Sequence, residues 1–468
     1  MIKHYNGVLG TFDYDDEMFE VTEDSNGAEY FGAPEYLHYV GDGDGDSVVL
    51  PEGCINTNRM FYNCKLPKDF NLGDNFDTSN VRKMNCMFAG CALPKGFTLG
   101  DKFDTSSAED MSHMFAGCQM PEGFNLGDKF NTSKVRTMHN MFGRLSGKTN
   151  RDFKYCTMSY DFNLGDKFDT SNVVDMSYMF RACKLPYGFT LGDRFDTSSV
   201  RNMGDMFDEC ELPMGFTLGD KFDTSNVVKM DGMFFMCVLP LSFTLGDKFD
   251  TSNVEDMHGM FAVCGMPPRF TLGDKFDTSK VTKMSCMFMD CIIPEGFILG
   301  DKFDTSSVTT MWHMFEGCRI PEGFTFGDKF DTSNVEDMSG MFDKCKMPEG
   351  FNLGDKFDTS KVTKMDCMFC DFIMPKGFTL GDKFDTSNVS SMFGMFMRCI
   401  MSTGFSFCGK FDTSKAEDVR SMFCDCTLPD GFVPDDSLDL SKFKELAQFL
   451  DGTVEPKDEE PMAMMSFF

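Results

Sequence analysis

Cysteine is the residue type in this chain with the clearest capacity for chemistry, since thiols bind metals, form disulfides and take part in redox reactions. The sequence has 20 cysteines in 468 residues, and two of them form the segment Cys367-Met-Phe-Cys370. A single C-x-x-C without a second pair at ligand spacing is weak evidence for zinc binding or redox work. We therefore favour a structural interpretation of this pair over a functional one.

Thirteen other cysteines recur at one place in a repeated unit, and a single copy has Phe372 there instead. A position that accepts Phe requires a bulky apolar side chain. Cysteines at equivalent positions of stacked coils have Cα–Cβ bonds that run in parallel, and this geometry disfavours a disulfide between them. We interpret the series as buried free thiols, suited to a reducing compartment, with disulfides and then metal binding as the alternatives. The thirteen are Cys64, Cys91, Cys118, Cys156, Cys183, Cys210, Cys237, Cys264, Cys291, Cys318, Cys345, Cys399 and Cys426.

An acidic segment near the N-terminus partly matches a calcium-binding loop. Asp42, Asp44 and Asp46 fit the first, third and fifth positions of an EF-hand loop. Ser47, however, replaces the glycine that such a loop requires, and Glu52 falls one position too early for the last ligand. These three aspartates are a weak metal candidate, and an acidic connecting loop is the favoured interpretation.

Acidic residues also recur along the chain, but no catalytic arrangement accompanies them. Pairs such as Asp220 and Asp223 are predicted to form two acidic rows, with Lys221 and its equivalents between them; calcium binding is the alternative. The six histidines are scattered, and no nucleophile elbow or phosphate-binding loop occurs. We predict a protein that is not an enzyme and has no cofactor.

The dominant feature is a repeat marked by FDTS or a close variant. Successive copies are 27 residues apart, except for one interval of 38, so eleven extra residues enter a single unit. With the Phe of FDTS as position 1, the unit reads F-D-T-S-x-V-x-x-M-x-x-M-F-x-x-C-x-L/M/I-P-x-G-F-x-L-G-D-K. The copies start at Phe76, Phe103, Phe130, Phe168, Phe195, Phe222, Phe249, Phe276, Phe303, Phe330, Phe357, Phe384 and Phe411.

Each unit is predicted to contain one strand and one short helical turn. Residues 215–222, GFTLGDKF, alternate Phe and Leu with small or polar residues, as in a half-buried strand. The spacing in M-F-x-x-C fits a single helical or 3₁₀ turn, and the repeated methionines are expected to fill the core. We predict a repeat solenoid of about 14 coils of 27 residues, mainly β with a short helical turn per coil.

Three regions are predicted along the chain. Residues 1–53 form an acidic N-terminal cap, expected to be β. Residues 54–426 form the solenoid, with the insertion near 143–156. Residues 427–468 supply a C-terminal half-repeat, a short amphipathic capping helix at 442–450 and an acidic tail.

The repeat resembles a known type. The run FDTSNVVDMSYMFRAC at 168–183 is similar to the mycoplasma-type repeats of the BspA-like leucine-rich-repeat proteins. This resemblance implies a leucine-rich-repeat-like solenoid and a non-catalytic surface or adhesin role. It carries over no active-site residues.

Charge and variable positions bear on the partner. The net charge is −30, which disfavours nucleic acid and anionic membranes, and no apolar run is long enough to cross a bilayer. A protein partner is expected instead, bound by a chain that is a monomer. Candidate contacts are the aromatic pair Trp312-His313 and the basic residues of the insertion, Arg144, Lys148, Arg151 and Lys154.

Localisation is predicted from the N-terminus and the thiols. The first twenty residues lack the apolar region of a signal peptide, which with the free thiols indicates the cytoplasm; the family resemblance offers the cell surface as the alternative. The sequence thus predicts a protein-interaction scaffold or adhesin-like protein. The other hypotheses are a structural or self-associating rod and an acidic calcium-binding surface protein.

Overall fold

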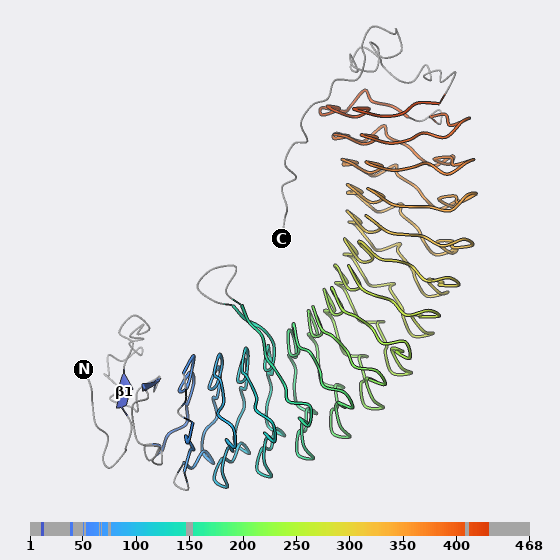
Figure 1. The fold of residues 1–468 in the computed structure, drawn as a ribbon. Helices are drawn as coiled ribbons and strands as arrows, with labels where there is room; N and C mark the ends of the chain where they lie inside the picture. Colours follow the sequence, from blue (N-terminus) through green and yellow to red (C-terminus); the bar gives the residue numbers. More distant parts are fainter. Residues whose placement is uncertain are drawn as a thin grey trace, which may run out of the picture.

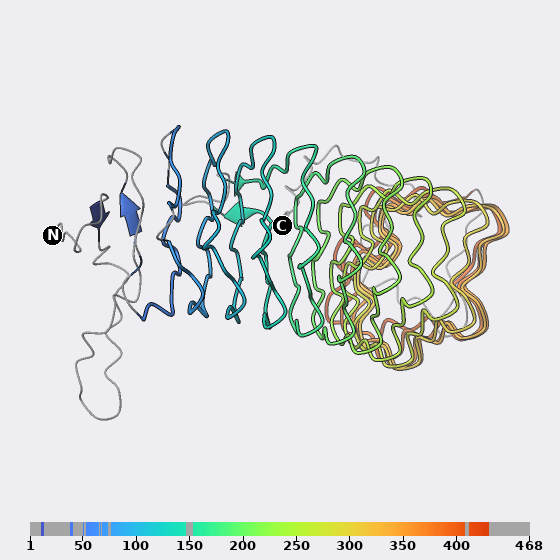
Figure 2. The ribbon, with the colours of Figure 1, turned by 90° about the horizontal axis from the view of Figure 1, so that it is seen from below.

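The repeats are stacked into an arc. The computed structural model describes residues 11–13, 38–40, 50, 53–64, 66, 68–73, 76–146, 153–407 and 411–429. Within these ranges each 27-residue unit makes one coil, and the coils lie one on the next along a curve (Figure 1). The view from below shows the same bend, with the later coils overlapping in projection (Figure 2).

Strands are few and short in the described part of the chain. β1 (Thr11–Asp13) pairs antiparallel with β2 (His38–Val40), and β3 (Leu145–Ser146) pairs antiparallel with β4 (Phe153–Lys154). Between coils there are isolated parallel bridges that join residues one unit apart. The coils are therefore held in register without continuous strands.

The M-x-x-M-F-x-x-C segment forms overlapping turns. In the coil that begins at Phe195, the amides of Met206 and Cys210 donate to carbonyls three residues back, at 3.2 and 3.1 Å. The amide of Phe207, which lies between them, donates to the carbonyl of Met233 in the next coil at 3.0 Å. Amides along the segment thus alternate between a bond inside the coil and a bond to its neighbour.

Left-handed residues separate these turns. Asp205 and Glu209, at positions 11 and 15, have φ of 53° and 55°, a region that side-chain-bearing residues rarely adopt. A right-handed helix cannot pass through such residues, and half of the amides already bond to the next coil. The segment therefore has helix-like spacing of its apolar residues without being a helix.

The predicted fold class is accordingly wrong. We expected coils that are mainly β with a short helical turn, but the described residues contain no helix, and their strands are limited to β1–β4. It follows that no described segment has the helical length and apolarity needed to span a membrane. The predicted leucine-rich-repeat-like architecture is wrong for the same reason, because the coils are built from turns and isolated bridges.

The predicted strand at 215–222 is also a pair of turns. Gly215 and Gly219 have φ of 80° and 82°, and the amides that follow them bend back inside the coil. Phe216 donates to Pro213 at 3.0 Å, and Phe222 donates to Gly219 at 3.2 Å. Phe and Leu point into the core here, as the period-2 pattern predicts. Tight turns, and not a strand, produce this alternation of buried and exposed side chains.

The core is a set of stacked side-chain rows. Phe at positions 1, 13 and 22 and Met at positions 9 and 12 are buried along the described stack. Cysteines at position 16 are buried in most coils, and Phe372 is fully buried in the coil that lacks one. No described cysteine forms a disulfide in the structure.

The bend follows from unequal spacing on the two sides of the coils. At position 13, where amides bond between coils, the rings of Phe207 and Phe234 have centroids 5.8 Å apart. At position 1, the rings of Phe195 and Phe222 are 6.4 Å apart. The hydrogen-bonded side is therefore the inside of the arc, and we call it the concave face.

The predicted end regions lie mostly outside the described residues. Of segment 1–53, the structure describes β1, β2, Leu50 and Gly53, and of segment 427–468 it describes 427–429. The capping helix predicted at 442–450 falls outside the described residues. The domain boundaries stay predictions.

Candidate interaction face

The concave face carries the positions at which the coils differ. Positions 10, 11, 14 and 15 alternate there with the buried positions 9, 12, 13 and 16. Because the backbone geometry repeats from coil to coil, equivalent side chains form rows along the arc. The chemistry of the face is thus decided by the residues in these four rows.

The insertion is anchored on this face. β3 and β4 project from the inside of the arc, between the N-terminal coils and the middle coils (Figure 1). Leu145 of β3 packs in a small cluster with Cys86, Ala89 and Ala116. A Cβ on Gly117 would lie 2.8 Å from the Cβ atoms of Leu145 and Lys154, so the hairpin fits against the bare backbone of that coil.

Two predicted basic residues of the insertion have partners within the chain. Lys154 Nζ lies 2.8 Å from Asn63 Oδ1 and 3.0 Å from the carbonyl oxygen of Gly90. Arg144 Nη1 lies 2.6 Å from Glu209 Oε1, and the Arg144 side chain is 12% exposed. Both contacts fix the insertion to coils on either side of it. Lys148 and Arg151 lie outside the described residues.

A cavity lies beside the hairpin. Its volume is about 370 Å³, and its lining includes Cys91, Gln119, Lys154 and Tyr155. The lining combines an amide, an ammonium and a phenol with apolar surface. Of the candidate partner contacts selected from the sequence and described in the structure, Lys154 lines it.

Apolar side chains are exposed on the middle of the concave face. Met236, Val263 and Trp312 are 45%, 36% and 37% exposed, and Phe235 and Met289 are half-buried close to them in the repeat. We call these five residues the central patch. Coils 222–248 and 249–275 have glycine at position 11, so a side chain is missing beside the patch in two consecutive coils.

The predicted aromatic pair lies at one end of this patch. The Trp312 ring is 5.4 Å from the ring of His258, two coils earlier, and 5.2 Å from the ring of His313. His313 Nδ1 contacts Glu316 Oε2 at 2.6 Å, and Glu316 Oε1 is 3.5 Å from Lys344 Nζ. Trp312 is thus available on the surface, whereas His313 is held in a charged network.

Carboxylates border the patch toward the N-terminus. Burial is the largest cause of the raised pKa of Asp205 and of Asp231, and repulsion from a neighbouring carboxylate adds to it in both. Burial also raises the pKa of Asp208 to about 7, against the opposing effect of Arg181, whose Nε lies 2.6 Å from its Oδ2. This border is an acidic surface in which several carboxylates are crowded.

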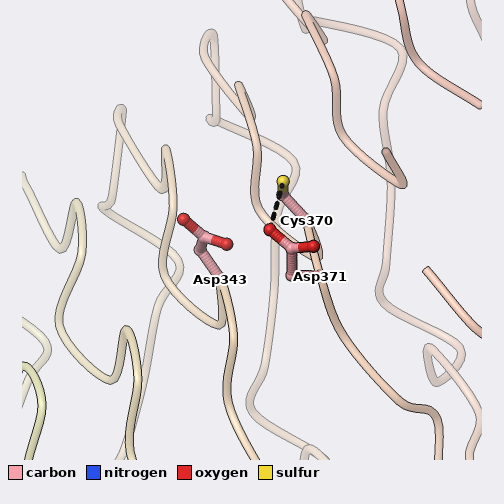
Figure 3. A group of neighbouring side chains, drawn as sticks. All are labelled: Asp343, Cys370 and Asp371. Carbon is pink, nitrogen blue, oxygen red and sulfur yellow. Dashed lines mark hydrogen bonds between the residues drawn. The ribbon is translucent and has the colours of Figure 1, made fainter. Parts of the chain in front are cut away.

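A second cluster lies toward the C-terminus. Oxygen atoms of Asp343 and Asp371 and the sulfur of Cys370 lie within 4.8 Å of one another (Figure 3). By ligand type this set suits a divalent cation. Arg398 nevertheless binds both oxygens of Asp371 at 2.6 Å, and Lys344 Nζ lies 3.5 Å from Asp343 Oδ2, so each carboxylate already has a cation. We therefore describe the cluster as an ion-pair network.

The weak calcium candidate cannot be placed. Asp42, Asp44 and Asp46 lie outside the described residues. Of the predicted aspartate rows, Asp220 is exposed at an outer turn, and Asp223 is half-buried. Calcium binding at either place stays a prediction.

A family model matches nearly the whole stack. The model is described as "Mycoplasma protein of unknown function, DUF285", and it matches residues 55–159, 148–266, 214–292, 243–347, 269–371, 319–430 and 352–455. These overlapping matches cover far more than half of the chain. The chain belongs to this family. The mycoplasma-type repeat that we predicted is confirmed at this level, and so are the tandem repeats.

The DUF285 assignment is coarser than the resemblance that the sequence suggested. The family model does not single out the BspA-like proteins. No curated protein and no solved structure matches the chain.

We did not predict from the sequence of this DUF285 protein where the insertion packs. The two consecutive coils before the insertion have glycine at position 15 and read M-F-A-G-C, at 87–91 and 114–118. Among the described coils after the insertion, only one has glycine there. Small residues on an otherwise variable surface position indicate that another segment lies against them. That pattern was readable, but it requires the insertion and the preceding coils to be considered together.

Proposed function

We propose that this protein is a non-catalytic scaffold that binds a protein segment through the central patch of its concave face. The observation that carries the proposal is the exposure, on one face, of Met236 and Val263 at position 15 of adjacent coils and of Trp312 at position 10 two coils further on. The partner we infer is a segment that presents an apolar side chain next to Lys or Arg.

The chemistry of the surface supports this partner. Aromatic and long apolar side chains supply most of the free energy at protein interfaces, and a Trp is among the most frequent anchors. Asp205, Asp231 and neighbouring carboxylates lie next to the patch, and the whole chain has a net charge of −30. Such a surface attracts cations, steers a basic partner toward it and repels acidic ones.

A peptide selection tests the proposal. The full chain is immobilised and used to select peptides from a random display library, and the selected peptides are then titrated in solution. Trp312 is the only tryptophan, so its fluorescence reports binding at the patch directly. We expect peptides with an apolar residue flanked by basic residues, and a change of Trp312 emission that saturates with peptide.

Matched variants decide whether the patch is the binding site. Met236→Asp with Val263→Asp is expected to weaken binding at least tenfold, because it buries charge in the interface. Ile298→Asp is the control, since Ile298 is 65% exposed at position 23 on the outer side of the arc. Equal loss of affinity in both variants, or selected peptides that bind without changing Trp312 emission, would contradict the proposal.

The BspA-like relationship and an adhesin role belong to this proposal as well. A concave binding face suits an adhesin as well as an internal scaffold. Surface labelling of intact cells that make the protein separates the two: biotinylation of its exposed lysines by an impermeant reagent supports the adhesin, and protection until lysis supports the scaffold.

A further inference from the structure

Two cysteines on the concave face lie in one turn. Cys367 and Cys370 occupy positions 11 and 14 of the same coil, and the amide of Cys370 donates to the carbonyl of Cys367 at 3.1 Å. Residues that close such a turn have Cα atoms less than about 7 Å apart, and a disulfide needs about 4.4–6.8 Å. The backbone therefore already holds the two Cα atoms at a separation that a disulfide can bridge.

Space around Cys367 favours reaction there. Cys367 is only partly buried, whereas Cys345 and Cys399, the position-16 thiols of the adjacent coils, are buried. The next coil has Gly394 beside it, and a Cβ on that residue would lie 3.3 Å from the Cys367 sulfur. The glycine thus leaves room beside the sulfur that a larger residue would take.

The electrostatic surroundings distinguish this pair from the buried thiols. Arg398 Nη2 lies 3.6 Å from the Cys370 sulfur and favours the thiolate of Cys367, whereas Asp343 and Asp366 oppose it. The pKa of Cys370 itself is raised by its contact with Cys367 and by burial. The neighbouring Cys370 thiol lowers the pKa of Cys367, whereas burial raises the pKa of core thiols such as Cys264. Only a thiolate attacks a disulfide, so the core thiols are inert by comparison.

The position-16 residue of the same coil also departs from the repeat. It is Phe372, which is fully buried, so the coil that carries the thiol pair has no core cysteine of its own. A core thiol there would compete for the mixed disulfide. The departure from the repeat and the thiol pair occur together in this one coil.

We propose that Cys367 and Cys370 form a redox-active dithiol that exchanges with a low-molecular-weight disulfide. The Cys367 thiolate attacks one sulfur of the small disulfide, forms a mixed disulfide and releases one thiolate. The Cys370 thiol then loses its proton and attacks the Cys367 sulfur, which forms the Cys367–Cys370 bond and releases the second small thiol. In balance, two protein thiols are oxidised to one disulfide, and one small disulfide is reduced to two thiols.

Oxidation also changes the local network. Cys370 Sγ donates to Asp371 Oδ2 at 3.6 Å, and this donor disappears when the sulfur enters a disulfide. The two short contacts of the Asp371–Arg398 ion pair do not involve the thiol proton. The modification therefore acts at one edge of the concave face and leaves the coil stack intact.

The test is a redox titration of the folded full chain. The protein is equilibrated in buffers with increasing ratios of oxidised to reduced glutathione, quenched in acid, alkylated under denaturing conditions and mapped by peptide mass spectrometry. We expect the peptide that contains Cys367 and Cys370 to lose both labels in one step, while the position-16 peptides stay labelled. Full labelling of this peptide in the most oxidising buffer would overturn the proposal.

Single substitutions identify the order of attack. Cys370→Ser is expected to trap a glutathione adduct on Cys367, because the resolving thiol is gone. Cys367→Ser is expected to leave Cys370 labelled. Cys286→Ser is the control, since Cys286 also occupies position 11 but has Met289 at position 14, and it should not change the titration. An adduct on Cys370 in Cys367→Ser as abundant as that on Cys367 in Cys370→Ser would contradict the assigned roles.

Discussion

The hydroxyl of Thr224 donates a hydrogen bond to the backbone carbonyl of Asp250, one coil further on, at 2.8 Å. Thr224 is fully buried, and equivalent threonines make the same contact along the stack, as Thr197 does with Asp223. The bond lies beside the wider-spaced side of the coils. It supplies a hydrogen bond between coils on the side where fewer backbone hydrogen bonds join them.

Replacing this threonine tests the contact. Thr224→Val keeps the shape but leaves a buried carbonyl without its donor, which costs about 1–3 kcal/mol. Thr217→Val, at an exposed site in the same coil region, is the control and should change little. The measurement is urea unfolding, together with hydrogen exchange of residues around 250. Equal stability of the two variants would show that the hydroxyl contributes nothing.

The seat of the insertion predicts a difference between two glycines. Gly117 and Gly123 have φ of 63° and 80°, so alanine costs about 1–2 kcal/mol of backbone strain at either site. Only at Gly117 would the new Cβ lie within 3 Å of the hairpin; nothing lies within 4 Å at Gly123. Gly117→Ala is therefore expected to raise hydrogen exchange in β3 and β4, and Gly123→Ala is not. Unchanged exchange in Gly117→Ala would mean that the hairpin does not rest on this coil.

The ion pair between Arg144 and Glu209 joins the insertion to a coil beyond it, at 2.6 Å. Because the Arg144 side chain is largely buried, removal of one partner leaves the other charge poorly solvated. Arg144→Met and Glu209→Gln are each expected to destabilise the chain, and a double-mutant cycle should give a coupling energy of about 1–3 kcal/mol. Additive effects of the two changes would show that the pair does not interact energetically.

The pKa of Asp208 predicts how stability varies with pH. Burial raises this pKa to about 7 in the fold, above the usual value of 3.8, so the folded chain holds the proton over a range in which the unfolded chain has lost it. The contribution to stability is present below pH 3.8 and is lost as the pH rises toward 7.

Asp208→Asn is accordingly expected to flatten the pH dependence of the melting temperature between pH 4 and 7, since Asn stays neutral over this range. Asp220→Asn, at an exposed outer turn, is the control and should leave the slope as it is. A slope in Asp208→Asn equal to that of the parent would contradict the assignment.

The inward-facing positions could be predicted from the sequence, whereas the backbone conformation could not. The recurrence of Phe, Met and Cys every 27 residues indicated a shared interior, and Phe372 identified position 16 as a packing site. The spacing of Met206, Phe207 and Cys210, however, fits a helical turn and overlapping turns equally well. The choice between them depends on hydrogen bonds to the next coil, such as that from the Phe207 amide to the Met233 carbonyl. The sequence of a single unit does not show where the carbonyls of the neighbouring coil lie.

The candidate site was predicted only in part. Trp312 was selected as the unique tryptophan, but Met236 and Val263 were not, because the repeat alone does not say that positions 14 and 15 lie on the inside of a bend. Arg144 and Lys154 were selected for their charge. Their internal partners, Glu209 and Asn63, lie 65 and 91 residues away, beyond the reach of any local pattern.

The alternating bonds of the turn segment give the stack a chemical direction. Met203, Asp205, Phe207 and Glu209 donate forward to the following coil, and the equivalent amides do so along the arc. Within this segment, a cut between two coils would therefore leave unbonded N–H groups on the first piece and unbonded carbonyls on the second, although amides elsewhere in the coil, such as that of Val228, donate backward. The two faces are complementary rather than alike, so separated pieces would rejoin head to tail, and two like ends would not adhere through these groups.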